Sequence, residues 1–223
     1  MTGVQTCALP ICTRTERLGT LAYRADNVSF FTRGGHQILD EARFVASLAS
    51  TQKGDAAVVL YSGAGEWALA QAEVGNASTI YAIDHPAFLG RARALVEAHP
   101  TATRIELVPS TVEVQSHPVA ASIVILPPIL RFLDESSALA VITAAIANLG
   151  PDGELFIVEV TNYAGVMPSS RPMLDLSLLV NTAAGSIHDV QYYQELVERA
   201  GGQLVKLHET GMLTVLRVRR GES

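Results

Sequence analysis

The stretch that decides the fold is Ala56-Ala57-Val58-Val59-Leu60-Tyr61-Ser62-Gly63-Ala64-Gly65, a short apolar run that ends in two glycines. An apolar run of this length is typical of a strand buried on both faces of a parallel sheet. Glycine then lets the backbone turn sharply and lets a ligand approach without a Cβ in the way. A helical pattern follows from about Glu66 to Val74, so the stretch predicts a strand, a glycine turn and a helix.

Strand-like apolar runs and helical patterns also alternate on both sides of this unit. Helix 37–50 is predicted before it, and Lys53-Gly54-Asp55 ends that helix. After it, we predict strands over 79–83, 104–108, 121–126 and 154–160, a helix over 86–98, and a helix that Asp134 or Ser136 caps and that runs to about Asn148. Gly150-Pro151-Asp152-Gly153 is predicted to be a tight turn at the end of that last helix.

The C-terminal part of the chain changes character. Helical patterns near 171–183 and 189–200 precede two β-rich runs, 203–208 and 212–218, which Glu209-Thr210-Gly211 separates. That spacing predicts an antiparallel hairpin. The whole pattern therefore predicts an α/β fold with a Rossmann-like, doubly wound sheet of seven strands, mostly parallel and ending in the antiparallel hairpin.

Composition narrows the classes of protein that the chain can belong to. Of its 223 residues, 48% are hydrophobic and 17% charged, which excludes a disordered chain. No apolar run reaches the ~18 residues of a membrane-spanning helix, so no membrane partner is expected. The net charge of −6 argues against nucleic acid as a partner. Cys7 and Cys12 are the two cysteines, so we expect a reducing, cytoplasmic setting and no metal site.

The N-terminus is treated apart from the fold. Residues 1–14 read MTGVQTCALPICTR and resemble the translation of a sequencing adapter that recurs at the start of metagenomic gene models. We expect this segment to be an artefact or a disordered tail, residues 15–50 to be a helical lead-in, and residues 51–220 to form one domain.

Candidate ligand-binding residues follow from the predicted topology, because ligands of doubly wound sheets bind beyond the carboxyl ends of the strands. Asp84 ends the second strand at about the 20-residue spacing from Gly65 that dinucleotide folds show, where a carboxylate can bind a ribose diol. These residues predict a nucleoside-containing cofactor, and a tight turn without a ligand is the alternative. Gly63-x-Gly65-x-x-Ala68 also fits the relaxed dinucleotide fingerprint, so an NAD-dependent reductase stays open, although its fold needs no terminal hairpin.

Four stretches resemble one family in collinear order from about residue 55 to residue 218. Asp84–Arg93, DHPAFLGRAR, resembles the "DLPxVxxxAR" stretch of bacterial and plant small-molecule O-methyltransferases, which include hydroxyneurosporene and acetylserotonin methyltransferases. Leu149–Glu159, LGPDGELFIVE, is similar to their "LkPGGrLlIvE". Leu174–Val180, LDLSLLV, looks like their "LDLxMLv", and Tyr192–Gly201 resembles their "ey..ll..AGF".

The resemblance implies a class I domain over residues 51–220 that binds S-adenosylmethionine. It implies methyl transfer to a hydroxyl group of a small aromatic or polyketide-like acceptor. The cofactor-binding residues that it implies are Tyr61, Ser62, Gly63 and Gly65 in the glycine loop, Asp84 at the ribose, His85 beside the adenosine, and Ser110, Thr111 and Val112 around the adenine. Met167, Met173, Leu178 and Asn181 are expected in the acceptor pocket. Relatives carry an N-terminal dimerisation domain, so a homodimer is expected if the native protein has one.

Several positions depart from the family pattern. Tyr61 stands where the family has an acidic residue, Trp67 replaces the third glycine near the cofactor's tail, and Thr111 replaces an aspartate. Each lost hydrogen bond is worth roughly 1–3 kcal/mol. The alternative function is therefore a catalytically degenerate module for binding or dimerisation.

The catalytic candidates are Arg131 and His188. Arg131 stands where the family has its histidine base, and arginine cannot act as a base. It can instead lower a phenol's pKa, stabilise an oxyanion or anchor a carboxylate. The alternative for Arg131 is an exposed arginine at a helix end. His188 is either a displaced base or a helix cap.

Overall fold

The structure is a computed structural model that describes residues 35–49, 56–112, 114–161, 171–182, 184–210 and 213–221. Three predictions concern residues outside this part of the chain. They are the predictions for residues 1–34, for Met167 in the acceptor pocket and for the hairpin turn at Gly211. The helices and strands are α3 (Gly35–Ala49), β1 (Ala56–Leu60), α4 (Glu66–Val74), β2 (Thr79–Asp84), α5 (Pro86–Glu97), η2 (Pro100–Arg104), β3 (Ile105–Pro109), β4 (Ala121–Leu126), η3 (Leu130–Phe132), α6 (Glu135–Ala147), β5 (Leu149–Glu159), α7 (Arg171–Asn181), α8 (Val190–Arg199), β6 (Gly202–Thr210) and β7 (Leu213–Arg220).

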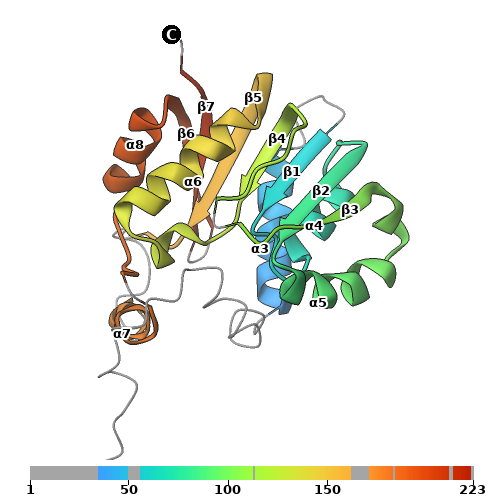
Figure 1. The fold of residues 1–223 in the computed structure, drawn as a ribbon, viewed down its shortest axis with the longest axis horizontal. Coiled ribbons are helices and arrows are strands. Elements are labelled where there is room, and N and C mark those ends of the chain that lie inside the picture. Colours follow the sequence, from blue (N-terminus) through green and yellow to red (C-terminus); the bar gives the residue numbers. More distant parts are fainter. Residues whose placement is uncertain are drawn as a thin grey trace, which may run out of the picture.

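The strands form one sheet in the order β3-β2-β1-β4-β5-β7-β6 (Figure 1). The five strands from β3 to β5 are parallel, whereas β7 runs antiparallel to both β5 and β6. This arrangement confirms the predicted fold class, including the C-terminal antiparallel pair. The chain leaves β3 at one edge and returns to β4 beside β1, so the switch point where such sheets bind ligands lies between β1 and β4.

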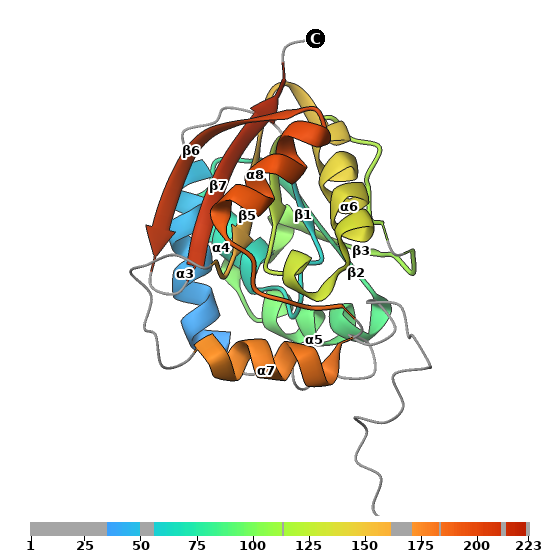
Figure 2. The same cartoon turned by 90° about the vertical axis from the view of Figure 1, so that its left-hand side faces the viewer.

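Helices cover both faces of the sheet, as a mostly parallel sheet requires (Figures 1 and 2). One hydrophobic cluster joins α6 and α8 to the sheet and includes Val124, Ile142 and Leu196. The other joins α3 and α4 to the opposite face and includes Ala46 and Phe156. Helix α7 lies beyond the carboxyl ends of the parallel strands in both views (Figures 1 and 2).

The starts of three helices are set by local hydrogen bonds. Asp134 caps α6, with its carboxylate accepting from the backbone N–H of Ser137 at 2.8 Å, so the first of the two predicted caps is confirmed. Asp189 caps α8 in the same way, accepting from Tyr192 N–H at 2.8 Å. His85 caps α5, whose first residue is Pro86.

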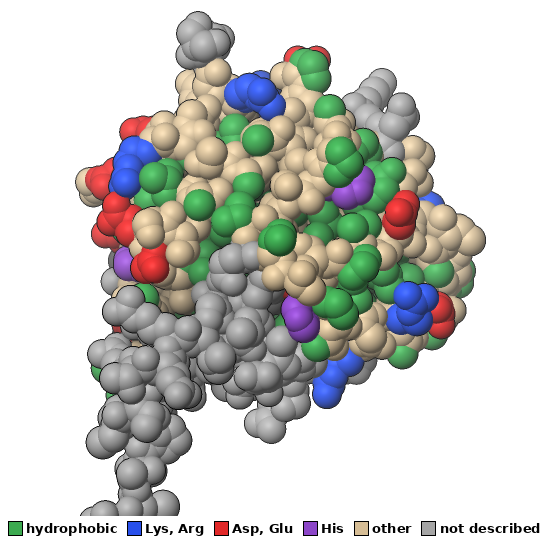
Figure 3. Space-filling view, viewed as in Figure 1, with side chains coloured by type: hydrophobic (Ala, Val, Ile, Leu, Met, Phe, Trp, Pro, Cys, Tyr) green, Lys and Arg blue, Asp and Glu red, His purple; other side chains and the backbone are tan. Residues whose placement is uncertain are grey.

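Helix α8 has one buried apolar face and one exposed polar face. Tyr193, Leu196 and Val197 are buried against the sheet, while Glu195 and Glu198 are exposed. The acidic side chains that gather at this edge of the molecule are visible in the space-filling view (Figure 3). The spacing is that of an amphipathic surface helix.

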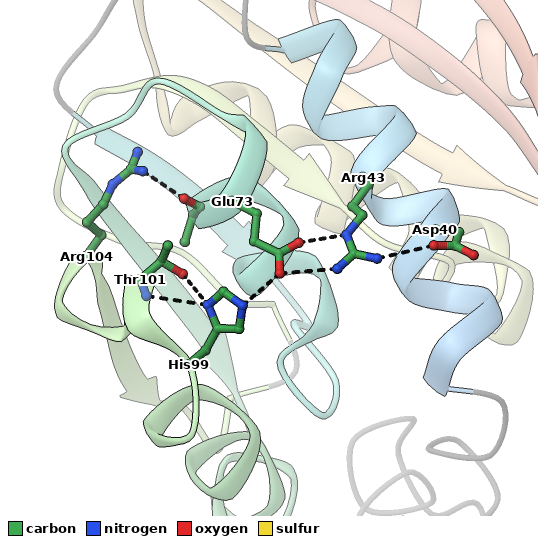
Figure 4. Close-up of polar contacts among 7 residues, drawn as sticks. Asp40, Arg43, Glu73, His99, Thr101 and Arg104 are labelled. Carbon is green, nitrogen blue, oxygen red and sulfur yellow. Dashed lines mark hydrogen bonds and ion pairs between the residues drawn. The ribbon is translucent and has the colours of Figure 1, made fainter.

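A polar cluster attaches α3 to α4 on the other face (Figure 4). Arg43 donates to Glu73 through Nε at 2.7 Å and through Nη2 at 3.2 Å, and it also pairs with Asp40 at 3.3 Å. His99 Nε2 lies 3.0 Å from Glu73 Oε1. The hydrogen bond from Arg43 is the main cause that lowers the pKa of Glu73. Helix α3 is thus attached to α4 by an ion pair, in addition to the packing of its apolar face against the hydrophobic core.

Arg104 closes the end of α4 beside this cluster. Its guanidinium donates to the carbonyl oxygen of Ala72 at 2.7 Å and to that of Gly75 at 3.1 Å, and it also donates to the carbonyl oxygen of Ala77. Ala72 lies in the last turn of α4, whose carbonyl oxygens have no further turn of helix to accept from, and a cation near a helix C-terminus is favourable.

Gly150 and Gly153, predicted to bound a tight turn, do lie close together, since a Cβ on Gly153 would lie 3.1 Å from the backbone nitrogen of Gly150, but they lie within a strand and not before it. These residues belong to β5, which begins at Leu149. Ala121 pairs with Leu149 but Ile123 pairs with Glu154, so the extra residues form a bulge. A Cβ on Gly153 would lie 2.5 Å from the carbonyl oxygen of Ala121, so glycine permits the close approach of the two strands. Glycine marks bulges and turns alike, and sequence does not separate the two.

No helix in the described ranges is both long and apolar enough to cross a membrane.

Candidate active site

The turn after β1 lies at the switch point and contains an unusual backbone conformation. Tyr61 has φ of 53°, the only positive φ of a non-glycine residue in the part of the chain that the structure describes. This left-handed conformation costs an ordinary residue about 1–2 kcal/mol. Gln115, in the loop after β3, holds it: Gln115 Oε1 accepts from Tyr61 N–H at 2.8 Å, and Gln115 N–H donates to Tyr61 Oη at 3.4 Å. Strain of this kind gathers at functional sites.

The two glycines of the turn serve different purposes. Gly63 has φ of 67°, and a Cβ there would meet only one atom within 4 Å, Glu66 Oε2 at 4.0 Å. Gly65 has φ of 99°, and a Cβ there would lie 3.1 Å from the Cβ of Ala92 on α5. Gly65 therefore allows α5 to pack closely, whereas the open side of Gly63 offers bare backbone to a ligand.

Asp84 reaches this turn from the end of β2, as predicted. Its Oδ2 accepts from the backbone N–H of Gly63 at 2.8 Å, and its Oδ1 accepts from that of His85 at 2.7 Å. The carboxylate is fully buried against the turn. Ser110, at the end of β3, donates its N–H to the Asp84 carbonyl at 2.9 Å. The structure thus brings the predicted residues at the ends of β1, β2 and β3 together.

Ser62 and the loop after β3 supply further candidate contacts. Ser62 is fully buried, and its Oγ has no hydrogen-bond partner among the described residues. A buried hydroxyl without a partner costs about 1–3 kcal/mol, which a ligand at this position can recover. Thr111 and Val112 follow Ser110 and are exposed, so their side chains are open to a ligand.

Glu66 is a further candidate site residue, which the sequence analysis did not propose. It is the first residue of α4 and only 8% exposed. Burial raises the pKa of its carboxyl group, against hydrogen bonds from its own backbone N–H and that of Ala64. Dinucleotide folds use such helix N-terminal N–H groups to hold a pyrophosphate. Here the carboxyl group of Glu66 interacts with one of these N–H groups, its own, at the first residue of α4. The sequence feature that could have indicated this residue is an acidic side chain directly after the two glycines of the turn.

Trp67, which the family motif places near the cofactor's tail, is buried in the hydrophobic core. It is 5% exposed and belongs to the hydrophobic cluster between α3, α4 and the sheet. The large side chain that replaces the third glycine thus extends the core.

Arg131 and Glu159 form a second group of polar side chains at the same edge of the sheet. Arg131 lies in η3 after β4, and Glu159 ends the neighbouring strand β5. Glu159 Oε1 accepts from Arg131 backbone N–H at 3.2 Å, and Arg131 Nη1 lies 3.3 Å from Glu159 Oε2. The Arg131 side chain is 17% exposed, so the alternative of an exposed helix-end arginine is wrong.

Burial dominates the electrostatics of this pair. It raises the pKa of the fully buried Glu159, and the charge of Arg131 opposes that rise. It also raises the pKa of Glu41 on α3, again against Arg131. The pKa of Tyr193 on α8 is raised well above its usual range by burial and by Glu159. Elements α3, β5 and α8 therefore all present titratable groups to Arg131.

His188 lies next to this group but does not cap α8, because Asp189 does. The capping alternative for His188 is wrong. Its ring stacks on Tyr192 with centroids 3.8 Å apart and meets Tyr193 edge-on at 6.0 Å. Burial lowers the pKa of His188. The segment before it is attached to η3, since Ser186 N–H donates to the carbonyl oxygen of Arg131 at 2.9 Å.

The residues predicted to line the acceptor pocket are only partly described. Leu178 on α7 is 2% exposed and packs in the core cluster of α6 and α8. Met173 and Asn181 also lie on α7, and their side chains are outside the described part of the structure.

No protein-family model matches the sequence, and no curated protein matches it. Solved structures do match the fold. An O-methyltransferase family protein from Burkholderia thailandensis has a TM-score of 0.73 at 21% identity, covering 95% of this chain and 66% of that one. An O-methyltransferase family 2 protein from Planctomyces limnophilus, in complex with apigenin, has a TM-score of 0.74 at 18% identity, covering 97% and 67%.

A third match is NcsB1, an O-methyltransferase of neocarzinostatin biosynthesis, in complex with S-adenosylmethionine and 2-hydroxy-5-methyl naphthoic acid. Its TM-score is 0.72 at 15% identity, covering 88% of this chain and 59% of that one. The chain thus has the fold of these O-methyltransferases and spans about three fifths to two thirds of their length.

Proposed function

We propose that this chain is an S-adenosylmethionine-dependent O-methyltransferase domain that methylates a hydroxyl group of a small aromatic or polyketide-like acceptor. The observation that carries the proposal is a glycine turn flanked by two buried carboxylates. Asp84 accepts from the backbone N–H of Gly63, and Glu66 Oε2 is the nearest atom to the open side of that glycine. The shared fold of the three O-methyltransferases supports the same function.

Two carboxylates at the turn favour a cationic cofactor over an anionic one. Opposite charges attract strongly in a buried site, and like charges repel. A pyrophosphate at the start of α4 would meet the Glu66 carboxylate, which argues against an NAD-dependent reductase. A sulfonium or ammonium group would be stabilised there instead. A bound cation would favour the ionised form of Glu66, whose pKa burial raises, and Glu66 would then take the part of the acidic residue that the family has at the position of Tyr61.

The residues of the turn fit S-adenosylmethionine, which when bound supplies an electrophilic methyl group. Gly63 offers the open backbone, and the Ser62 hydroxyl lacks a partner in the described residues. Asp84 would hold the ribose, with His85, Ser110, Thr111 and Val112 around the adenosine. Tyr61 and Gly65 shape the turn that contacts the methionine part.

The acceptor would bind beside Arg131 and His188, the catalytic candidates, with Met167, Met173, Leu178 and Asn181 as its pocket. Arg131 cannot remove a proton, so its contribution is positive charge. Methyl transfer gains most of its rate from alignment of the reacting atoms, which a fixed guanidinium serves. The hydroxylated aromatic ligands of the apigenin and naphthoic acid complexes support this acceptor class.

The proposal also includes the oligomeric state and the cellular setting of the whole protein. A homodimer would form through the further domain that relatives carry. A reducing cytoplasmic setting is supported by the sequence after residue 12, which contains no cysteine.

Transfer of a labelled methyl group from S-adenosylmethionine to a panel of phenols and hydroxy acids tests the proposal. We expect a labelled product with the wild-type chain, none with Gly63→Val, whose side chain fills the open side of the turn, and wild-type yield with the control Gly90→Ala. Binding of S-adenosylhomocysteine without transfer to any acceptor would favour the degenerate binding or dimerisation module. Absence of both would contradict the proposed function.

A further inference from the structure

We infer that Arg131 anchors an acceptor that is already an anion, either an aromatic hydroxy acid held by its carboxylate or an acidic phenol held by its phenolate. The inference rests on the proposed function, which it extends to the charge of the acceptor. The observation that supports it is that the buried guanidinium of Arg131 has only part of its N–H donors paired with Glu159.

Only part of the Arg131 guanidinium is occupied by Glu159. A guanidinium has five N–H donors in a planar fork. One of its nitrogens, Nη1, contacts Glu159 at 3.3 Å, and the other contact between the two residues comes from the Arg131 backbone. Arg131 Nε is buried and has no acceptor among the described residues. A buried, charged donor of this kind is completed by an anionic oxygen, which forms stronger hydrogen bonds than a neutral one.

Glu159 is a positioning residue in this arrangement. Its Oε1 accepts from the backbone N–H of Arg131 and its Oε2 from that of Val160, each at 3.2 Å, and Oε2 also accepts from Nη1 at 3.3 Å. The carboxylate is thus committed to fixing η3 and the guanidinium. Phe132 adds a second wall, since the guanidinium carbon lies 5.0 Å from its ring centroid.

The titratable groups that interact with Arg131 lie on several elements. They include the carboxyl groups of Glu159 on β5 and Glu41 on α3, where the charge of Arg131 opposes the rise in pKa that burial causes. The pKa of Tyr193 on α8 is raised and that of His188 is lowered, in both cases chiefly by burial. The buried Nε of Arg131, which has no acceptor among the described residues, is what favours an anion next to it.

A phenolate acceptor also removes the need for the missing base. When its oxygen has already lost its proton to solvent, a bond forms between that oxygen and the methyl carbon, and the carbon–sulfur bond breaks with its electron pair passing to sulfur. In a hydroxy acid held by its carboxylate, the hydroxyl proton passes to solvent water as the oxygen–methyl bond forms. This is consistent with an arginine in the position where relatives have a histidine.

The test compares 2-hydroxybenzoate with 2-hydroxybenzamide, which differ in charge but scarcely in shape. Both are titrated into the full chain, with and without S-adenosylhomocysteine, by calorimetry. We expect the acid to bind about tenfold more tightly than the amide, the difference of one charge-assisted hydrogen bond. Arg131→Gln should abolish the preference and Arg131→Lys should keep part of it. Arg199→Gln is the control, because Arg199 also pairs with a glutamate but is 52% exposed.

Two further variants separate anchoring from loss of structure. Glu159→Gln removes an acceptor that fixes the guanidinium, so it should reduce the preference for the acid without changing the affinity for the amide, whereas a damaged site would weaken both. Arg131→Met/Glu159→Leu removes both partners of the buried pair and should fold while losing the preference. A third ligand, 4-nitrophenol, distinguishes the two anions: preference for it over phenol indicates phenolate binding, and preference confined to the benzoate indicates a carboxylate anchor.

Equal affinity for the acid and the amide, or no binding of the acid at millimolar concentration, would overturn the inference. So would methylation of neutral phenols at a rate that His188→Gln abolishes, because His188 would then be a base. Failure of S-adenosylhomocysteine to bind overturns the proposed function instead, and the acid-to-amide comparison without it still tests the anchor.

Discussion

Asp84 Oδ2 accepts a hydrogen bond from the backbone N–H of Gly63 at 2.8 Å, so the end of β2 fixes the turn that follows β1. The two residues were expected to meet around one adenosyl group, and they do lie together. The contact also shows that Asp84 supports the shape of the turn, in addition to any ligand it holds. Mutations here should therefore affect stability and binding together.

Asp84→Asn should destabilise the fold by about 1–3 kcal/mol, because an amide cannot accept both N–H groups that the carboxylate now accepts. It should also weaken binding of S-adenosylhomocysteine. Chemical denaturation and calorimetric titration measure the two effects. Unchanged values in both experiments would show that the carboxylate has neither role.

Gly63→Ala should destabilise the protein by about 1 kcal/mol, because its φ of 67° is unfavourable for alanine even though the space is open. Gly90→Ala is the matched control. Gly90 lies in α5 with no atom within 4 Å of a Cβ, so alanine should stabilise the helix by roughly 0.5–1 kcal/mol. Denaturation midpoints that shift in the same direction would contradict this assignment.

Glu73→Gln should destabilise the protein at neutral pH and make less difference in acid. The folded-state pKa of Glu73 is lowered, so its contribution is present above the ordinary pKa of glutamate and is lost as the pH falls through the lowered value. Denaturation of both proteins between neutral pH and about pH 3, below the usual glutamate pKa, measures the effect. A gap that stays constant across this range would exclude the ion pair with Arg43 as the cause.

Arg104→Lys should destabilise the protein by about 1–3 kcal/mol, because a lysine cannot reach the carbonyls of Ala72, Gly75 and Ala77 at once. Arg93→Lys, at an exposed pair with Glu97, should have almost no effect. Thermal denaturation compares them, and equal shifts would show that the carbonyl contacts contribute nothing.

The parts of the fold that depend on local signals were predictable. The apolar run of β1 and the glycines after it gave β1 and α4 nearly to the residue. Asp134 acts as a cap through a backbone N–H three residues away, a contact that sequence shows directly. The parallel order followed from the alternation of strands and helices.

The parts that were missed depend on tertiary contacts or on ambiguous signals. Gln115 holds Tyr61 across 54 positions of sequence, and Glu159 holds Arg131 across 28, which no local pattern reveals. Gly150 and Gly153 read as a turn because a bulge uses the same residues. Trp67 packs in the hydrophobic cluster of α3, α4 and the sheet, a tertiary contact that its position in the motif does not indicate.

The most direct test of the central claim, that the turn between Tyr61 and Glu66 holds the ammonium group of an adenosyl cofactor, is calorimetric titration of the full chain with S-adenosylhomocysteine and with NADH. We predict one-to-one binding of S-adenosylhomocysteine, at least about tenfold weaker binding to Glu66→Gln, the loss expected for one charge-assisted contact, and no binding of NADH. Binding of NADH, or of neither ligand, would contradict the account.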